Sequence, residues 1–108
     1  MEDLNVGDVV RIKGHENRDT TFLGEPKNSL GYVYEVYHLG KERGVSTITE
    51  SGCDLGGFSP DEISDHLVYV STIDFKYDFR SVSWLFQDWK KGKFDPFIKE
   101  VEELKSIS

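Results

Sequence analysis

The stretch at positions 31–49 reads GYVYEVYHLGKERGVSTIT and predicts two β-strands that fold back on each other. Its first strand, 32–37, is dense in aromatic and β-branched residues, and its second, 45–49, is almost wholly β-branched. The loop between them, 40–44, has two glycines and three charged residues, which is typical of a solvated hairpin loop. We expect the rest of the chain to pack around this hairpin.

Shorter strands are predicted on both sides of the hairpin. Apolar residues alternate with basic ones at 9–13, and two further apolar runs predict strands at 53–58 and 67–70. Two adjacent glycines in the run at 53–58 indicate a bulge or a close approach of two backbones. Ser59 and Glu62 have the spacing of a capping box, so a single helical turn is expected before the strand at 67–70.

The C-terminal third is predicted to form one more strand and two helices. Strict alternation at 73–80 places apolar residues on one face of a strand and charged residues on the other. A helix is expected between a cap at Ser81 or Ser83 and a stop at Gly92, with the apolar stripe Val82, Leu85, Phe86 and Trp89. A second helix is expected to begin at Asp95, with the stripe Phe97, Val101 and Leu104 and with Ile98 at its border.

Length and charge limit the classes of protein to which this chain can belong. Its 108 residues are enough for one domain with a real core, and 37% of them are hydrophobic. The net charge is −7, with 13 acidic and 6 basic residues in 1–66 and seven of each in 67–108. An acidic half disfavours binding to nucleic acid and would attract a basic partner. One cysteine, no signal peptide and no membrane-spanning apolar run predict a cytoplasmic protein that does not associate with membranes.

Four segments resemble the small SH3-like β-barrels of the KOW and Tudor type. They are VGDVVRI at 6–12, LGYVYEV at 30–36, FSPDEI at 58–63 and LVYV at 67–70. The resemblance implies a mainly β, α+β fold: a small barrel of five to six antiparallel strands that closes with one helical turn before its last strand. We therefore expect a single domain, 1–108, with the barrel and the extra strand at 5–80 and the two C-terminal helices at 81–108 packed on it.

The aromatic residues of the hairpin are the first candidates for a binding site. Tyr32, Tyr34 and Tyr37 lie on its first strand, and Phe58 lies on the following strand. In Tudor-type barrels, clustered rings form a cage for a methylated cation, held by cation–π attraction and often by a nearby acid, for which the candidates here are Glu35 and Asp54. The alternative is that the rings pack in the core. Alternation places Tyr32 and Tyr34 on one face of the strand and Tyr37 on the other, unless a bulge intervenes.

Trp84 is a further candidate because it lies off the apolar stripe of its predicted helix and is expected to be partly exposed. No catalytic or metal-binding residues are predicted. His15, His38 and His66 have no recognised metal-ligand spacing, and Asp54, the acidic neighbour of Cys53, disfavours a reactive thiolate.

The sequence therefore favours a non-enzymatic protein-interaction module without cofactors that is a monomer or a weak homodimer. An alternative is an accessory subunit or regulatory domain of an enzyme complex, in which the long connection at 14–31 grips the partner. Nucleic-acid binding is a third possibility, which the acidic charge disfavours.

Overall fold

The central hairpin contains the two longest strands of the protein, β2 (Leu30–Leu39) and β3 (Glu42–Thr49). Our computed structural model describes residues 3–13 and 28–107, so most of the long connection at 14–31, including His15, lies outside the described residues. The turn between β2 and β3 is only Gly40 and Lys41, shorter than the loop predicted at 40–44. Gly40 has φ 65°, a conformation that suits glycine in a two-residue hairpin turn.

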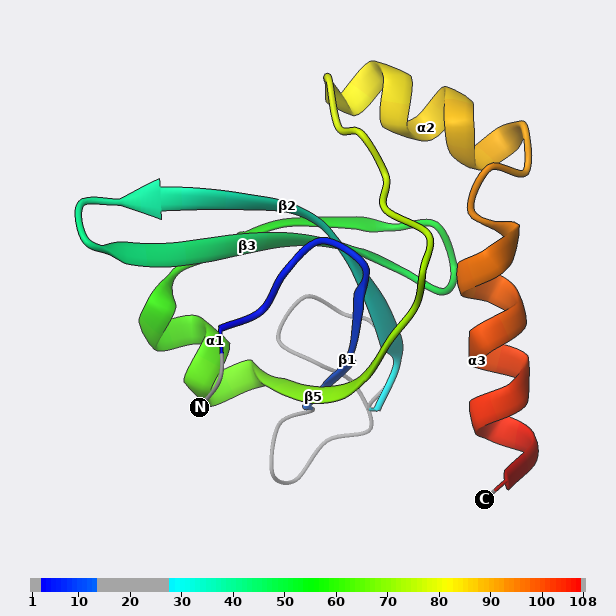
Figure 1. Ribbon diagram of the computed structural model, residues 1–108, viewed down its shortest axis with the longest axis horizontal. Helices are drawn as coiled ribbons and strands as arrows, with labels where there is room; N and C mark the ends of the chain where they lie inside the picture. Colours follow the sequence, from blue (N-terminus) through cyan, green and yellow to red (C-terminus); the bar gives the residue numbers. More distant parts are fainter. Residues whose placement is uncertain (1–2, 14–27, 108) are drawn as a thin grey trace.

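Five antiparallel strands form one sheet in the order β4-β3-β2-β1-β5 (Figure 1). The other strands are β1 (Asp8–Ile12), β4 (Asp54–Phe58) and β5 (Leu67–Thr72). This confirms a mainly β, α+β fold with five antiparallel strands. The sheet of the described residues is not closed into a barrel, because β4 and β5 remain its two edges. Helix α1 (Pro60–His66) lies beside β3, β4 and β5, and is longer than the single turn predicted.

A β-bulge at Tyr34 decides which side chains share a face of the sheet. Val33 pairs with Thr47, whereas Glu35 pairs with the adjacent Ser46, so the strand gains one residue at Tyr34. The bulge turns the following residues over. As a result, Tyr37 lies on the same face as Tyr34, and not on the opposite face that simple alternation predicts.

The two faces of the sheet cover two separate apolar clusters. The first cluster contains Tyr32, Tyr34 and Ile48 of the sheet, and the second contains Val33, Val45 and Phe58. Helix α3 (Asp95–Ile107) covers the first cluster, and the buried side chains that it and the preceding turn contribute are Phe94, Phe97 and Val101. Each face of the sheet therefore has its own hydrophobic core.

Residues 73–81 form an extended strap and not the extra strand that was predicted, because they pair with no strand of the described sheet. The alternation itself is correct, since Phe75, Tyr77 and Phe79 turn toward the first cluster while the charged residues between them are exposed. A side chain replaces the missing strand partner: the Tyr32 hydroxyl donates to the Phe75 carbonyl (2.7 Å) and accepts from the Tyr77 amide (2.9 Å).

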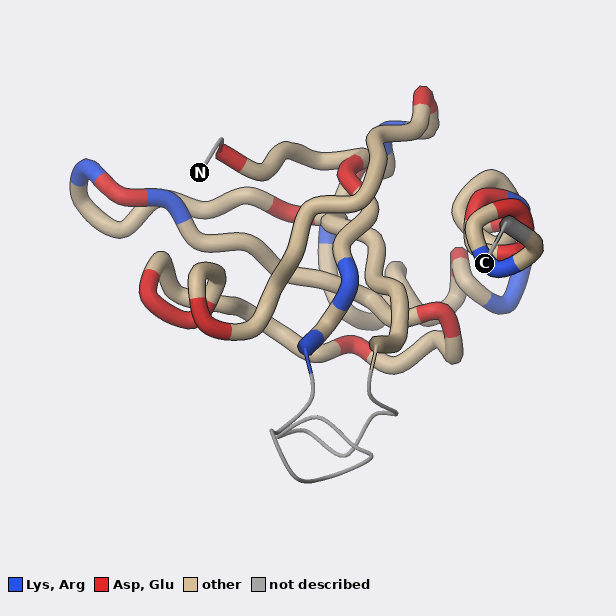
Figure 2. Tube along the Cα trace, turned by 90° about the horizontal axis from the view of Figure 1, so that it is seen from below, with Lys and Arg blue, Asp and Glu red and all other residues tan. Residues whose placement is uncertain are grey.

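The strap leads into α2 (Val82–Lys90), which Ser81 caps and which ends before Gly92 at φ 83°. In the view of Figure 1 the strap rises from β5 to α2, which lies above the hairpin, and α3 stands beside the sheet. Charged residues gather at the tip of the hairpin, on α1 and along α3 (Figure 2).

Candidate functional site

Two of the predicted site residues belong to the core. Tyr32 is fully buried, and its ring contacts Phe75, Phe94 and Phe97 at centroid distances of 5.5–5.7 Å. Phe58 is buried in the second cluster, on the opposite face of the sheet. Neither ring is part of the accessible surface, so neither is available to a ligand.

Tyr34 is also buried, but its hydroxyl reaches a polar group of side chains. It donates to Asp54 Oδ1 at 2.7 Å, and the same carboxylate accepts from the Gly56 amide at 2.8 Å. The Ser46 hydroxyl, close by, donates to Glu35 at 3.1 Å. Burial first, and then the carboxylate of Asp54, raise the pKa of Tyr34 above its ordinary value, which keeps the phenol protonated as a donor.

Tyr37 lies across two glycines of the neighbouring strands. A Cβ at Gly44 would meet the Tyr37 ring, and a Cβ at Gly57 would lie 2.7 Å from its hydroxyl. The ring therefore rests directly on backbone. We call the group formed by Tyr34, Glu35, Tyr37, Ser46 and Asp54 the acidic strand face.

The acidic strand face does not form the cage of several rings that the resemblance implies. Tyr32 is in the core, and Phe79 covers the Tyr34 ring at a centroid distance of 4.8 Å. One half-exposed ring, that of Tyr37, remains near the carboxylates of Glu62 and Glu35. This arrangement can attract a cation by charge, but it cannot surround one with aromatic rings.

Helix α2 carries the most exposed aromatic side chain of the predicted site. Trp84 is 45% exposed, and the Arg80 guanidinium lies 5.5 Å from the centre of its ring. Only half of the apolar stripe of this helix is buried. Leu85 is buried and Trp89 packs on the first cluster. Val82 and Phe86, the other two residues of the stripe, are 44% and 39% exposed. The sequence predicted Trp84 at the surface but not Val82 and Phe86.

A buried polar contact fixes α2 to the strap. The Tyr77 hydroxyl donates to Asp88 of α2 at 2.5 Å, and Lys93 forms an ion pair with the same carboxylate at 3.3 Å. The hydrogen bond from Tyr77, followed by Lys93, lowers the pKa of Asp88. The orientation of α2, and with it the exposure of its side chains, is therefore set by specific bonds as well as by packing.

A hollow of about 330 Å³ lies on the other side of the sheet, where sequence analysis placed no site. Its walls come from the residues before β1, from the start of β3 and from α1, and include Leu4, Val45, Pro60 and Ile63. Lys41, Glu42, Arg43 and Asp3 supply charged groups around it. No pattern of spacing joins these three segments, so only the folded chain could reveal the hollow.

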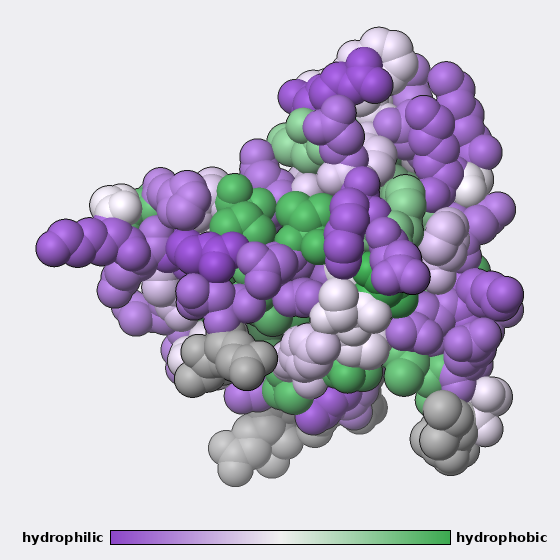
Figure 3. All heavy atoms as spheres, in the orientation of Figure 1, coloured by the Kyte–Doolittle hydropathy of each residue, from purple (hydrophilic) through white to green (hydrophobic). Residues whose placement is uncertain are grey.

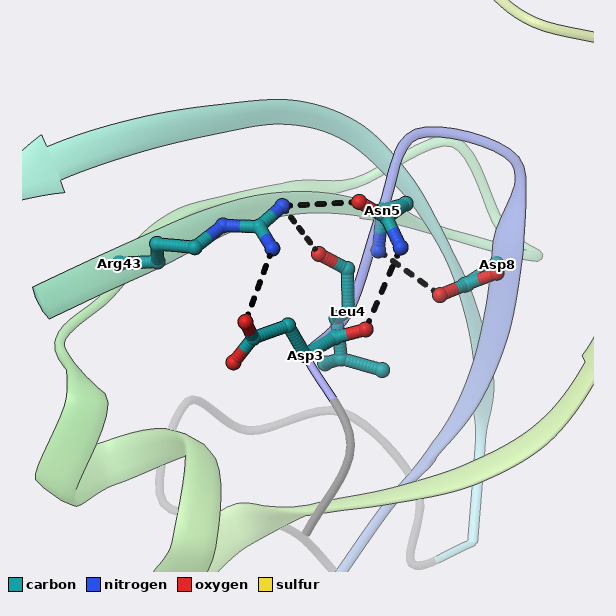
Figure 4. A network of polar contacts seen from close by, with 5 residues as sticks. All are labelled: Asp3, Leu4, Asn5, Asp8 and Arg43. Carbon is teal, nitrogen blue, oxygen red and sulfur yellow. Dashed lines mark hydrogen bonds and ion pairs between the residues drawn. The ribbon is translucent and has the colours of Figure 1, made fainter.

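Arg43 holds the segment before β1 against this hollow (Figure 4). Its guanidinium donates to the Leu4 carbonyl (2.9 Å) and to Asn5 Oδ1 (2.8 Å), and pairs with Asp3 at 3.2 Å. The Leu4 side chain is buried in the second cluster. Arg43 thus recognises a short stretch of chain by its main-chain carbonyl, an amide oxygen and a carboxylate.

Groups of three or more His, Cys, Asp or Glu side chains that could hold a metal ion do not occur among residues 3–13 and 28–107. Cys53 is exposed at the turn that leads to β4. None of the helices in the described part of the chain is long and apolar enough to cross a membrane.

No family model, no curated protein and no solved structure matches this chain.

Proposed function

We propose that this protein is a non-enzymatic interaction module that binds a partner protein through α2. The observation that carries the proposal is the exposure of Val82, Trp84 and Phe86, three large apolar side chains on one nine-residue helix. Aromatic side chains at the surface are the residues that most often dominate the binding energy of protein interfaces.

The charges around α2 indicate the kind of partner. Arg80 precedes the helix, and Lys90 and Lys91 end it; all three side chains are exposed. A partner with an apolar patch bordered by carboxylates fits this surface, although the chain as a whole is acidic. Such a partner can be an enzyme, in which case the protein serves as an accessory or regulatory subunit.

We also propose that the sheet is a variant of the SH3-like architecture. The strand order, with β1 between β2 and β5, and a short helix directly before β5 support this assignment. The fold supports no specific function, because small barrels of this kind serve many unrelated roles. The proposed role therefore rests on the surface of α2 and not on the resemblance.

The proposal is tested by affinity purification of the tagged protein from its native cells, with variants of α2. We expect the V82S/F86S double variant and Trp84→Ala each to lose a partner that the unchanged protein retains. Ser83→Ala and Gln87→Ala are matched controls, because both residues are exposed polar positions on the same helix. Retention of every partner by both α2 variants, with circular dichroism showing them folded, would refute the proposal.

A further inference from the structure

The hollow beside α1 is not used by the proposed function, because it lies on the opposite side of the sheet from α2. Leu4, Val45 and Ile63 at the hollow belong to the second apolar cluster, whereas α2 packs on the first. A volume of about 330 Å³ is within the range of ligand pockets, roughly 300–1,000 Å³. The hollow is therefore a second candidate binding site, separate from α2.

The chain itself shows what this region binds. Residues 3–5 have no strand partner in the described sheet, yet they are held in place by Arg43 and by the burial of Leu4. The order of groups is a carboxylate at Asp3, an aliphatic side chain at Leu4 and an amide at Asn5. This segment lines the hollow through Asp3 and Leu4, and Arg43 holds it by an ion pair and hydrogen bonds, as a bound peptide would be held.

The groups around the empty volume repeat the chemistry that holds Asp3 and Leu4. Pro60 and Ile63 are half-buried and offer an apolar surface, with the buried Val45 behind them. Both Val45 and Ile63 are part of the apolar environment that buries Leu4. Lys41 at the hairpin turn is exposed and makes no ion pair within residues 3–13 and 28–107. Its ammonium group is therefore available to pair with a carboxylate of a partner, in the way that the Arg43 guanidinium pairs with Asp3. Glu42 beside it disfavours a second negative charge.

We propose that the hollow between β3 and α1 binds an extended segment of a partner protein in which one aliphatic residue directly follows an aspartate or glutamate. The aliphatic side chain enters the space between Val45, Pro60 and Ile63, and the carboxylate pairs with Lys41. The segment before β1 stays in place and forms one wall through Leu4. In the space-filling view of Figure 3, hydrophobic side chains reach the surface among hydrophilic neighbours on this face of the molecule.

The test is a titration of the isotope-labelled full chain, followed by amide NMR shifts. The probe is the peptide acetyl-Ser-Asp-Leu-Asn-Ser-amide, and the control peptide has Asn-Ser in place of Asp-Leu. We expect saturable shifts confined to residues 41–45 and 61–64 with the first peptide and none with the second. Shifts that lie elsewhere, or that are equal for both peptides, would overturn the proposal.

Three variants make the titration specific. Lys41→Ala is expected to weaken the first peptide about two- to fivefold, the effect of one exposed ion pair. Ser64→Trp, at an exposed position of α1 on the rim, is expected to abolish binding by filling the hollow. Lys99→Ala, an exposed lysine of α3 on the other side of the sheet from the hollow, is the control and should leave affinity unchanged. If Lys41→Ala and Lys99→Ala bind the peptide equally well, the carboxylate does not pair with Lys41 and the proposal fails.

Discussion

The Tyr32 hydroxyl accepts a hydrogen bond from the Tyr77 amide at 2.9 Å, although the two residues are 45 positions apart in the sequence. Tyr32 is on β2, and Tyr77 is in the strap, which pairs with none of the five strands described. The same hydroxyl donates to the Phe75 carbonyl, so one side chain satisfies two backbone groups of the strap. This contact fixes the path of the chain into α2.

Tyr32→Phe is predicted to lower the free energy of unfolding by about 2–3 kcal/mol, because it leaves the Phe75 carbonyl and the Tyr77 amide unpaired inside the protein. Urea unfolding measures the loss, and hydrogen exchange at the Tyr77 amide should become faster. Tyr69→Phe is the matched control, since Tyr69 is half exposed and its hydroxyl forms an exposed hydrogen bond with Thr72. Equal effects of the two substitutions would contradict the role assigned to Tyr32.

Acid is predicted to weaken the contact between the strap and α2. The pKa of Asp88 is lowered by Tyr77 and Lys93 below its ordinary value of 3.8, so its ionised form stabilises the folded state above that pH. This contribution is lost as the pH falls through the lower pKa of the folded state. We expect the free energy of unfolding of Asp88→Asn to depend less on pH below about 4 than that of the unchanged protein.

Alkali is predicted to unfold the protein together with the ionisation of its buried tyrosines. Burial raises the pKa of Tyr32 from 10.0 to about 12, and raises those of Tyr34 and Tyr77 as well. The neutral phenols favour the folded state, and this stability is lost as the pH rises above 10.0, the value for an unperturbed tyrosine. Tyrosinate absorbance for these three groups should therefore appear in step with the loss of circular dichroism. Their complete ionisation in a protein that remains folded would show that the hydroxyls are accessible.

Thr47→Val is predicted to raise the free energy of unfolding by about 1 kcal/mol, because the Thr47 hydroxyl is buried without a hydrogen-bond partner in the described structure. Valine has the same shape and removes the unsatisfied group. Thr49→Val is the control on the same strand, since the Thr49 hydroxyl contacts Ser51 and accepts from the Cys53 amide. It should lower stability in the same thermal or urea unfolding experiment, and the opposite ranking of the two variants would disprove the prediction.

Gly44→Ala is predicted to destabilise the hairpin by about 1–3 kcal/mol, because its Cβ would overlap the Tyr37 ring. In a Tyr37→Ala background the same change should cost much less, since the ring is absent. A double-mutant cycle in urea measures this coupling. Gly40→Ala is the control for backbone conformation. Gly40 has a positive φ, and a Cβ there would meet nothing within 4 Å, so this substitution measures backbone strain without a steric contact. No coupling between Gly44→Ala and Tyr37→Ala would mean that the ring lies elsewhere.

Local sequence signals determined most of the individual elements. The capping box at Ser59 and Glu62 is present, with the Ser59 amide donating to Glu62, and Ser81 and Gly92 bound α2 as expected. These features involve residues a few positions apart, so backbone geometry and hydrogen bonding along the chain suffice to fix them. The bulge expected in the run at 53–58 is also present, at Leu55, where the register between β3 and β4 shifts by one residue.

The candidate surfaces were predicted only in part. The exposure of Trp84 followed from its place off the apolar stripe, whereas burial of Tyr32 and Phe58 depends on the helices and strands that cover them. The exposure of Val82 and Phe86 was not predictable from the sequence, because their spacing of four residues is typical of the buried face of a helix. A hydrophobic stripe shows which side chains can be buried together, but not how far the neighbouring element extends over them.

The sequence by itself determined the central hairpin, the alternation at 73–80, the helix caps and the uneven charge, because each depends on the order of residues along the chain. Tertiary structure decided that 73–80 is a strap held by Tyr32, that the sheet stays open, and that a bulge brings Tyr37 beside Tyr34. It also placed Arg43 against residues 3–5 and formed the hollow next to them. The strap and the placement of Arg43 depend on contacts between residues 45 and 38 positions apart, and the bulge depends on the register between two strands. No local pattern records the energies of such contacts.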